Sequence, residues 1–114
     1  MRFIWIALIL LVSPAFAQDW QELDGAGILA ALNDQTYDYP RGVWQQFSQS
    51  GETLYNAGRD SWGNWRVEGD QYCSQWPPGQ DWDCFVVDST PDGRQIRFRG
   101  EFGDITVGLL RGGS

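Results

Sequence analysis

Acid–base chemistry in this chain could come only from carboxylates, because the sequence contains no histidine and no lysine. That composition excludes the histidine base of hydrolytic triads, Schiff-base lysines and histidine metal ligands. The remaining carboxylate pair is Asp81 and Asp83, which share one face of a predicted strand beside Trp82. Among fifteen carboxylates such a pair arises easily by chance. We therefore expect no catalytic residues, and a carboxylate-based hydrolase is the least favoured function.

A calcium loop is a second candidate, because Asp88-Ser-Thr-Pro-Asp92-Gly93 imitates the start of an EF-hand. The twelfth position of that loop is Arg99, where an EF-hand requires glutamate. A Pro-Asp-Gly run between two strand patterns is typical of a type I turn with glycine after it. The sequence therefore predicts a turn here, and neither a metal nor a cofactor.

Residues 1–17 are typical of a cleaved signal peptide. Met1-Arg2 gives a positive start, residues 3–12 are apolar without interruption, and Ala15-Phe-Ala17 matches a cleavage signature. We expect cleavage between Ala17 and Gln18. The alternative is a membrane anchor, but ten apolar residues span only about 15 Å as a helix, roughly half the hydrocarbon thickness. The predicted location is periplasmic or secreted, without membrane contact after the signal is removed.

Removal of the signal leaves residues 18–114, which we expect to form a single domain. The formal net charge of the whole chain is −7, and the signal takes away one arginine and no carboxylate. An acidic chain repels nucleic acid and anionic membranes, so neither is an expected partner. We expect a monomer that binds an unknown protein or a small ligand.

Cys73 and Cys84 are predicted to form a disulfide, because the compartment of a small exported domain is oxidising. If residues 77–80 close a hairpin, the two cysteines lie directly opposite each other, at the short separation that a disulfide needs. The alternative is a redox or metal-binding pair. The spacing of the two cysteines is not the Cys-x-x-Cys of such pairs, and the chain has no further thiol or imidazole, so this alternative is less favoured.

One helix is predicted at about residues 24–33, with Asp24 as its N-cap and Asn33-Asp34 as its stop. From residue 36 onward, short aromatic and β-branched runs alternate with Gly, Pro, Asp and Asn, which is typical of strands joined by turns. Eight strands are predicted, at residues 36–39, 42–48, 53–56, 63–68, 71–76, 84–89, 95–99 and 105–110.

Connections this short join only antiparallel neighbours, so the expected fold is mainly β, an antiparallel up-and-down eight-stranded barrel. Such a barrel is wide enough to be filled by side chains or to hold one small ligand. Apolar alternation predicts which side chains face the interior: Trp65, Val67, Ile96, Phe98, Ile105, Val107 and Leu109.

The segment from Gly63-Asn-Trp65 through Gly69-Asp70 to Cys73, followed by Cys84, resembles a group of small exported bacterial proteins catalogued as a domain of unknown function. The resemblance extends to the run Leu32-Asn-Asp-Gln-Thr36 and, with Ser50 in place of the usual Asp, to the turn Ser50-Gly51-Glu52. It covers nearly all of the mature chain. It implies a periplasmic, lipocalin-like small barrel and no catalytic residues.

The chain is also similar to periplasmic barrels that inhibit secreted metalloproteases, which have one disulfide and a Gly-x-Trp strand. In those inhibitors an N-terminal segment enters the protease cleft. Residues 18–23 would have that role here.

Binding sites are predicted from aromatic and charged side chains near the ends of strands. Trp62 and Trp82 lie next to turns and charges, and we expect them to be the exposed tryptophans. Arg97 and Arg99 alternate on the outer face of one strand, where they meet an anionic partner or only balance nearby carboxylates. The favoured function is a non-enzymatic periplasmic binding or inhibitor module, and the alternative is a small-ligand carrier. A lumen filled by Trp65, Phe98, Ile96 and Val107 would exclude the carrier.

Overall fold

The computed structural model describes residues 19–112 of the chain. The predicted signal peptide at residues 1–17 and its cleavage site before Gln18 lie outside the described residues. The elements are β1 (Gln21–Glu22), α1 (Gly25–Leu32), β2 (Gln35–Asp38), a 3-10 turn (Pro40–Gly42), β3 (Trp44–Phe47), β4 (Glu52–Asn56), β5 (Asp60–Glu68), β6 (Gln71–Gln75), β7 (Trp82–Ser89), β8 (Gln95–Gly100) and β9 (Ile105–Leu110).

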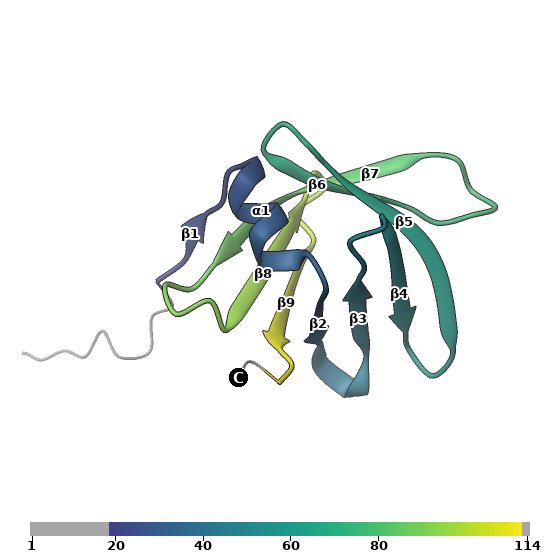
Figure 1. Ribbon diagram of the computed structural model, residues 1–114, viewed down its shortest axis with the longest axis horizontal. Helices are drawn as coiled ribbons and strands as arrows, with labels where there is room; N and C mark the ends of the chain where they lie inside the picture. The colour runs from purple at the N-terminus through teal and green to yellow at the C-terminus, as the bar shows by residue number, and fades with distance from the viewer. Residues whose placement is uncertain (1–18, 113–114) are drawn as a thin grey trace, which may run out of the picture.

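Strands β2 to β9 form a closed antiparallel barrel in which each strand pairs with the next along the chain (Figure 1). The last strand, β9, returns to pair with β2 at Tyr37 and Asp38. The predicted eight-stranded up-and-down barrel is confirmed. A ninth strand, β1, was missed, because two residues are too few to show a periodicity; it pairs with the end of β7.

The strand boundaries differ from the prediction by two residues or more at three places. β3 begins at Trp44 rather than at residue 42, because Pro40–Gly42 forms a 3-10 turn in which Arg41 and Gly42 have positive φ angles of 67° and 77°. β5 begins three residues early, at Asp60, and its residues 60–64 pair with the whole of β4. β7 begins at Trp82, where Gln75 pairs with Trp82 in the predicted register.

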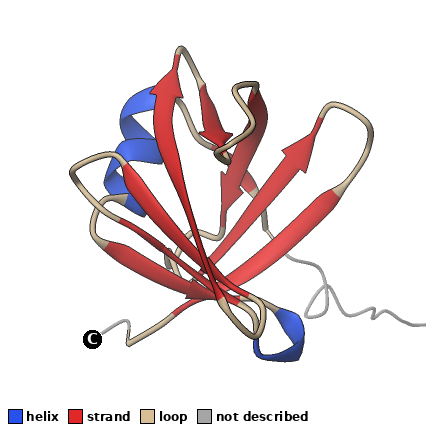
Figure 2. Ribbon diagram, turned by 90° about the vertical axis from the view of Figure 1, so that its right-hand side faces the viewer, coloured by secondary structure: helices blue, strands red, loops and turns tan. Residues whose placement is uncertain are grey.

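Helix α1 closes one end of the barrel, packing against β2, β5 and β6. Asp24 is its N-cap, as predicted, and its carboxylate accepts a hydrogen bond from the Gly27 amide at 2.8 Å. The Gly25 amide donates to Oδ1 of Asp70 in the β5–β6 turn at 2.8 Å. Figure 2 shows α1 and the 3-10 turn at opposite ends of the barrel, so the end that carries the 3-10 turn is not covered by the helix.

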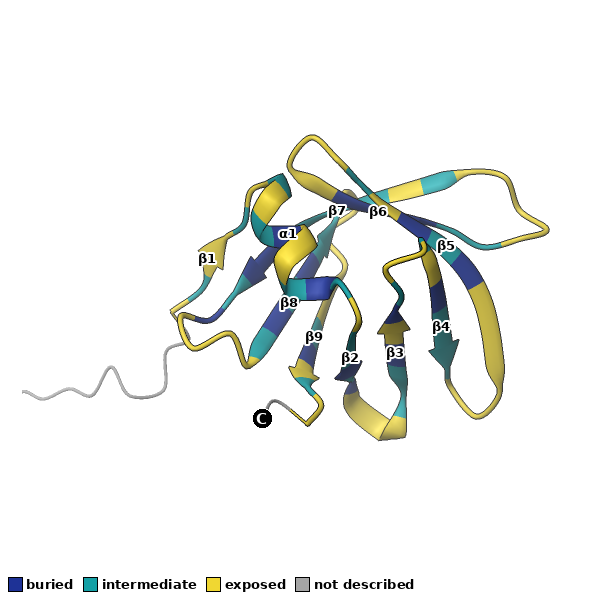
Figure 3. Ribbon diagram, viewed as in Figure 1, coloured by how far each residue is buried: buried dark blue, intermediate teal, exposed yellow. Residues whose placement is uncertain are grey.

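The apolar core extends from α1 into the barrel interior. Phe47 is fully buried there, and its ring makes edge contacts with Tyr37, Trp65 and Tyr72 and a stacked contact with Phe98. Figure 3 shows buried segments alternating with exposed ones along the strands. The core consists of Ile28, Leu32, Tyr37, Tyr39, Phe47, Trp65, Tyr72, Val87, Ile96 and Phe98.

The predicted orientation of β9 is wrong. Ile105 and Leu109 are 59% and 56% exposed on the outer surface, whereas Gly108 between them is buried. A Cβ on Gly108 would lie 2.8 Å from Cε1 of Tyr39, so only glycine fits between this strand and the buried tyrosine ring. Because side chains alternate along a strand, this contact turns Val107 outward and removes it from the predicted lumen. Trp65, Val67, Ile96 and Phe98 do belong to the core or pack against it.

Candidate ligand-binding site

The end of the barrel opposite α1 contains a cavity of about 550 Å³ that opens to solvent. Its walls are mostly aromatic, its polar side chains are uncharged, and no charged residue among residues 19–112 lines it. Both the size and the apolar character are typical of small-molecule sites. The lining residues are Tyr39, Gln45, Tyr55, Ser61, Trp62, Tyr72, Ser74, Trp76, Pro77, Phe85, Phe98 and Thr106.

Trp76, the first residue after β6, forms one wall because β5 leaves room for its ring. A Cβ on Gly63 would lie 2.5 Å from Cε3 of Trp76, so the indole packs directly on the glycine backbone. The indole Nε1 donates to Oγ of Ser74 at 3.2 Å, and the ring makes an edge contact with Tyr55 at a centroid distance of 6.0 Å. The ring therefore has a fixed orientation at the mouth of the cavity.

The floor of the cavity is a hydrogen-bonded group centred on the buried amide of Gln45. Tyr39 donates its hydroxyl to Oε1 of Gln45 at 2.8 Å. Nε2 of Gln45 donates to Oγ1 of Thr53 at 2.9 Å and to the hydroxyl of Tyr72 at 3.2 Å. The hydroxyl of Thr53 donates a hydrogen bond to the backbone carbonyl of Gln46 at 2.7 Å. The amide of Gln45 thus has partners for both of its donors without a ligand.

The tyrosines around this floor stay uncharged at neutral pH. Burial raises the pKa of Tyr72 to about 12, although hydrogen bonds with Ser74 and Gln45 act in the opposite direction. Burial also raises the pKa of Tyr39 well above its ordinary value of 10.0, with smaller contributions from neighbouring tyrosines. Desolvation favours the neutral phenol in both cases. The cavity therefore presents neutral aromatic rings over the physiological pH range.

Of the two tryptophans predicted to be exposed, only Trp62 is. Its side chain is 55% exposed and lines the mouth of the cavity. Trp82 is half-buried on the outer surface of β7, because the guanidinium of Arg66 covers its ring at 3.8 Å from the centroid. The sequence prediction therefore overestimated the accessibility of Trp82, and Trp82 does not line the cavity.

Arg97 and Arg99 lie side by side on the outer face of β8 and share one buried carboxylate. Nε of Arg97 and Nε of Arg99 donate to Oδ2 of Asp88 at 2.8 Å and 2.7 Å. Arg99 also reaches Glu22 of β1 at 3.2 Å, and Arg97 lies over the ring of Trp20 at 4.6 Å. The two arginines thus balance carboxylates of the same chain and attach the N-terminal segment to the barrel.

Asp88 is only 2% exposed, and burial acts to raise the pKa of its carboxyl group. The hydrogen bonds from Arg99 and Arg97 outweigh that effect, so the pKa lies below its ordinary value of 3.8. Asp88 is therefore ionised at neutral pH, and its carboxylate is bound by two arginines and not by a metal ion. Asp92, in the predicted turn, accepts from Thr90 at 2.8 Å and from the Arg94 amide at 3.1 Å, contacts typical of a closed turn.

The carboxylate pair considered for catalysis is exposed at the surface. Asp81 lies just before β7 and Asp83 is its second residue, and neither lines the aromatic cavity. No hydrogen bond or ion pair joins either of them to another described side chain. The arrangement provides no desolvated acid beside an ionised base, which carboxylate catalysis requires.

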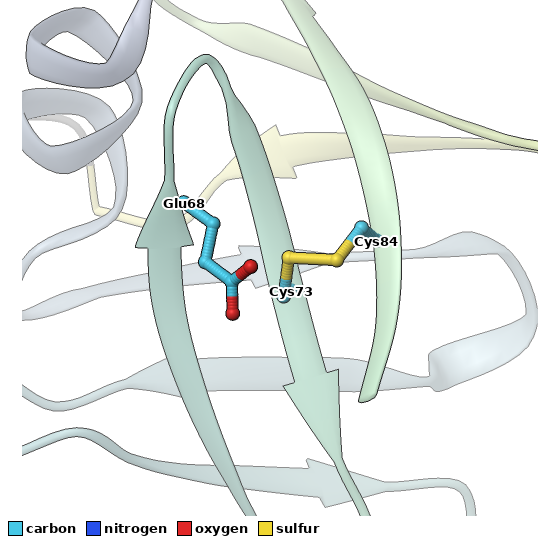
Figure 4. A group of neighbouring side chains, drawn as sticks. All are labelled: Glu68, Cys73 and Cys84. Atoms are coloured by element: carbon cyan, nitrogen blue, oxygen red, sulfur yellow. A yellow bond between two sulfur atoms is a disulfide. The ribbon is translucent and has the colours of Figure 1, made fainter. Parts of the chain in front are cut away.

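The predicted disulfide between Cys73 and Cys84 is confirmed, with the two residues directly paired across β6 and β7. The carboxylate of Glu68 lies beside the bridge in the only cluster of potential metal ligands among residues 19–112 (Figure 4). A closed disulfide offers no thiolate, so this cluster lacks the sulfur ligands that a metal would need. The bridge is compatible with an oxidising, exported location.

Sequence reasoning identified Trp62 as a binding residue and Phe98 as an interior residue, but it missed most of the residues that line the cavity. Tyr39, Tyr55 and Trp76 each lie at the end of a predicted strand or one residue before it, at the same end of the barrel, and this shared position was the available signal. Gln45 alternates with the buried Phe47, which marks it as an inward-facing polar residue. Its role depends on contacts with Tyr72, 27 positions away, which no local pattern shows.

Within residues 19–112 no helix has the length and apolarity to cross a bilayer. No protein-family model, curated protein or solved structure matches the chain. The chain is a closed eight-stranded antiparallel barrel with an aromatic cavity at one end.

Proposed function

We propose that this protein is an exported, non-enzymatic small-ligand carrier that holds its ligand in the open end of a lipocalin-like barrel. The observation that carries this proposal is the cavity of about 550 Å³ between the aromatic mouth and the Gln45 floor. A barrel whose lumen was packed throughout would leave no such volume. Val107 faces outward and does not fill the lumen, and the core residues Tyr39, Tyr72 and Phe98 also line the cavity.

The predicted signal peptide and the disulfide support a periplasmic or extracellular place of work. The acidic charge of the chain and its lack of histidine and lysine favour binding over catalysis. The carrier therefore takes precedence over the inhibitor module that the sequence favoured.

Native mass spectrometry tests the proposal, on protein purified from the periplasm of the cells that naturally produce it. The expected result is a bound small molecule at one per chain. Thr106→Phe places a ring in the mouth of the cavity at an exposed position, so it is expected to remove the bound species without unfolding the barrel. Thr106→Ser keeps the opening and should retain the species. A chain that carries no small molecule, in either wild type or Thr106→Ser, would contradict the carrier.

A protein-binding module is the second candidate, supported by apolar side chains at the same end of the barrel. Phe102 in the β8–β9 turn is 91% exposed, next to the exposed Ile105 at the start of β9. Exposed aromatic residues are common anchors of protein interfaces. A stoichiometric envelope protein recovered with the wild type and lost with Phe102→Ser would favour this candidate over the carrier.

A further inference from the structure

The chemistry of the cavity wall narrows the class of ligand, an inference that rests on the proposed function. The rings that line the cavity include electron-rich indoles and phenols: Tyr39 at the floor, and Tyr55, Trp62 and Trp76 nearer the mouth. The faces of such rings carry partial negative charge and attract cations. None of the arginines that the structure describes lines the cavity to compete for these faces. An organic cation would therefore find several aromatic faces available.

The rim of the cavity carries an excess of negative charge. The turns at this end and the strand residues beside them comprise residues 39–43, 57–60, 76–83 and 101–104. They contain two arginines and five carboxylates: Arg41, Arg59, Asp60, Asp81, Asp83, Glu101 and Asp104. A cleft edged by one sign of charge concentrates ligands of the opposite sign. Anionic ligands are disfavoured for the same reason.

The hydrogen-bonding pattern argues against a strongly hydrated ligand. The floor amide of Gln45 is already engaged by Tyr39, Thr53 and Tyr72. Hydroxyls that make no hydrogen bond to other described residues belong to Tyr55, Ser61 and Thr106. A sugar or a primary ammonium group would lose water at the floor without replacement, which is costly. A quaternary ammonium has no N–H to satisfy and loses little on entering an aromatic site.

We propose that the cavity selects a quaternary or similarly alkylated organic ammonium ion that carries an apolar ring. The cationic head lies against the indole and phenol faces, and a hydroxyl on the ligand meets the unpaired hydroxyls near the mouth. The acidic rim raises the rate of encounter. This selectivity distinguishes the site from an apolar cavity that takes neutral compounds.

The test uses three ligands of similar shape that differ in charge. These are 3-hydroxyphenyltrimethylammonium, its neutral isostere 3-tert-butylphenol, and the anion 3-tert-butylbenzoate. Isothermal titration calorimetry of the exported, disulfide-bonded protein is expected to give a dissociation constant about tenfold lower for the cation than for the phenol, as aromatic faces in a partly desolvated site provide. The anion 3-tert-butylbenzoate should bind more weakly than either the cation or the phenol.

Tryptophan variants locate the effect. Trp62→Leu and Trp76→Leu should each reduce the preference for the cation at least threefold, whereas Trp44→Leu, outside the cavity and beneath Arg111, should leave it unchanged. Trp62 is 55% exposed, so that variant remains informative if Trp76→Leu unfolds. Equal or tighter binding of the phenol, or binding of none of the three, overturns the ligand class. The carrier proposal is tested separately, by whether Thr106→Phe removes the bound small molecule that native mass spectrometry detects.

Discussion

Gly63 lies directly under the indole of Trp76, so that an added Cβ would be 2.5 Å from the ring and 2.7 Å from the backbone oxygen of Gln75. This contact links the Gly-x-Trp pattern of β5 to the aromatic cavity. Glycine at position 63 lets Trp76 lie flat on the strand, and Trp65 two residues later faces the core. Residues 63–65 thus contribute both to the wall of the cavity and to the apolar core.

Gly63→Ala is expected to destabilise the protein by about 1–3 kcal/mol, because backbone on one side and a packed ring on the other leave no room for a methyl group. Urea denaturation followed by circular dichroism measures the change. Ser61→Ala, two positions earlier on the same strand and exposed, is the matched control and should stay within about 0.5 kcal/mol of wild type. Equal stability of the two variants would show that Trp76 does not pack on this glycine.

Gln45→Leu should cost about 1–3 kcal/mol in free energy of unfolding, because it leaves the buried hydroxyl of Tyr39 without its acceptor. Gln46→Leu changes the next residue, whose side chain is exposed on the outer face, and should have little effect. Thermal unfolding of both variants checks the difference. If Gln46→Leu proved the more damaging substitution, the assignment of faces on β3 would be wrong.

Loss of the Cys73–Cys84 bridge is expected to lower stability by about 3 kcal/mol, since the crosslink restricts a short loop of the unfolded chain. The double variant Cys73→Ala with Cys84→Ala, compared with wild type in urea, measures this effect. Thiol titration of the unreduced, unfolded wild type should find no free sulfhydryl. Two reactive thiols would contradict the bridge.

Stability should fall in acid because of Asp88. Its carboxyl pKa is lower in the folded protein than the ordinary value of 3.8, so the folded state holds this group ionised more strongly than the unfolded state does. The resulting stabilisation is present above about pH 4 and is lost as the pH falls through the lowered folded pKa. Asp88→Asn is therefore expected to be less stable than wild type at pH 7, with the gap closing towards pH 2.

Denaturation midpoints at several pH values between 2 and 7 measure that gap. Asp83→Asn is the control, because this exposed carboxylate makes no ion pair with a described residue. A gap between wild type and Asp88→Asn that stays constant with pH would mean that Arg97 and Arg99 do not favour the ionised form of Asp88.

Local features of the sequence were sufficient for the helix, the eight barrel strands and their order. Asp24 caps α1 because a carboxylate before a helical apolar spacing satisfies an unpaired amide, and short turns can join only antiparallel neighbours. The pairing of Cys73 with Cys84 follows from counting residues on either side of one turn. These are relations between residues close together in the chain, which a sequence displays directly.

Relations across the barrel were decided only by the tertiary structure. Alternation in β9 identified two faces but not which one is inner; Gly108 faces inward because the ring of Tyr39 occupies the lumen there. The two-residue strand β1 pairs with the distant end of β7, and its Glu22 contacts Arg99, 77 positions away. The cavity itself depends on how far rings from five strands, and from the residues that follow β2 and β6, extend into a shared space, a volume that no single segment encodes. Sequence alone therefore determined a disulfide-closed β-barrel, and packing between distant strands determined that one end of it is open.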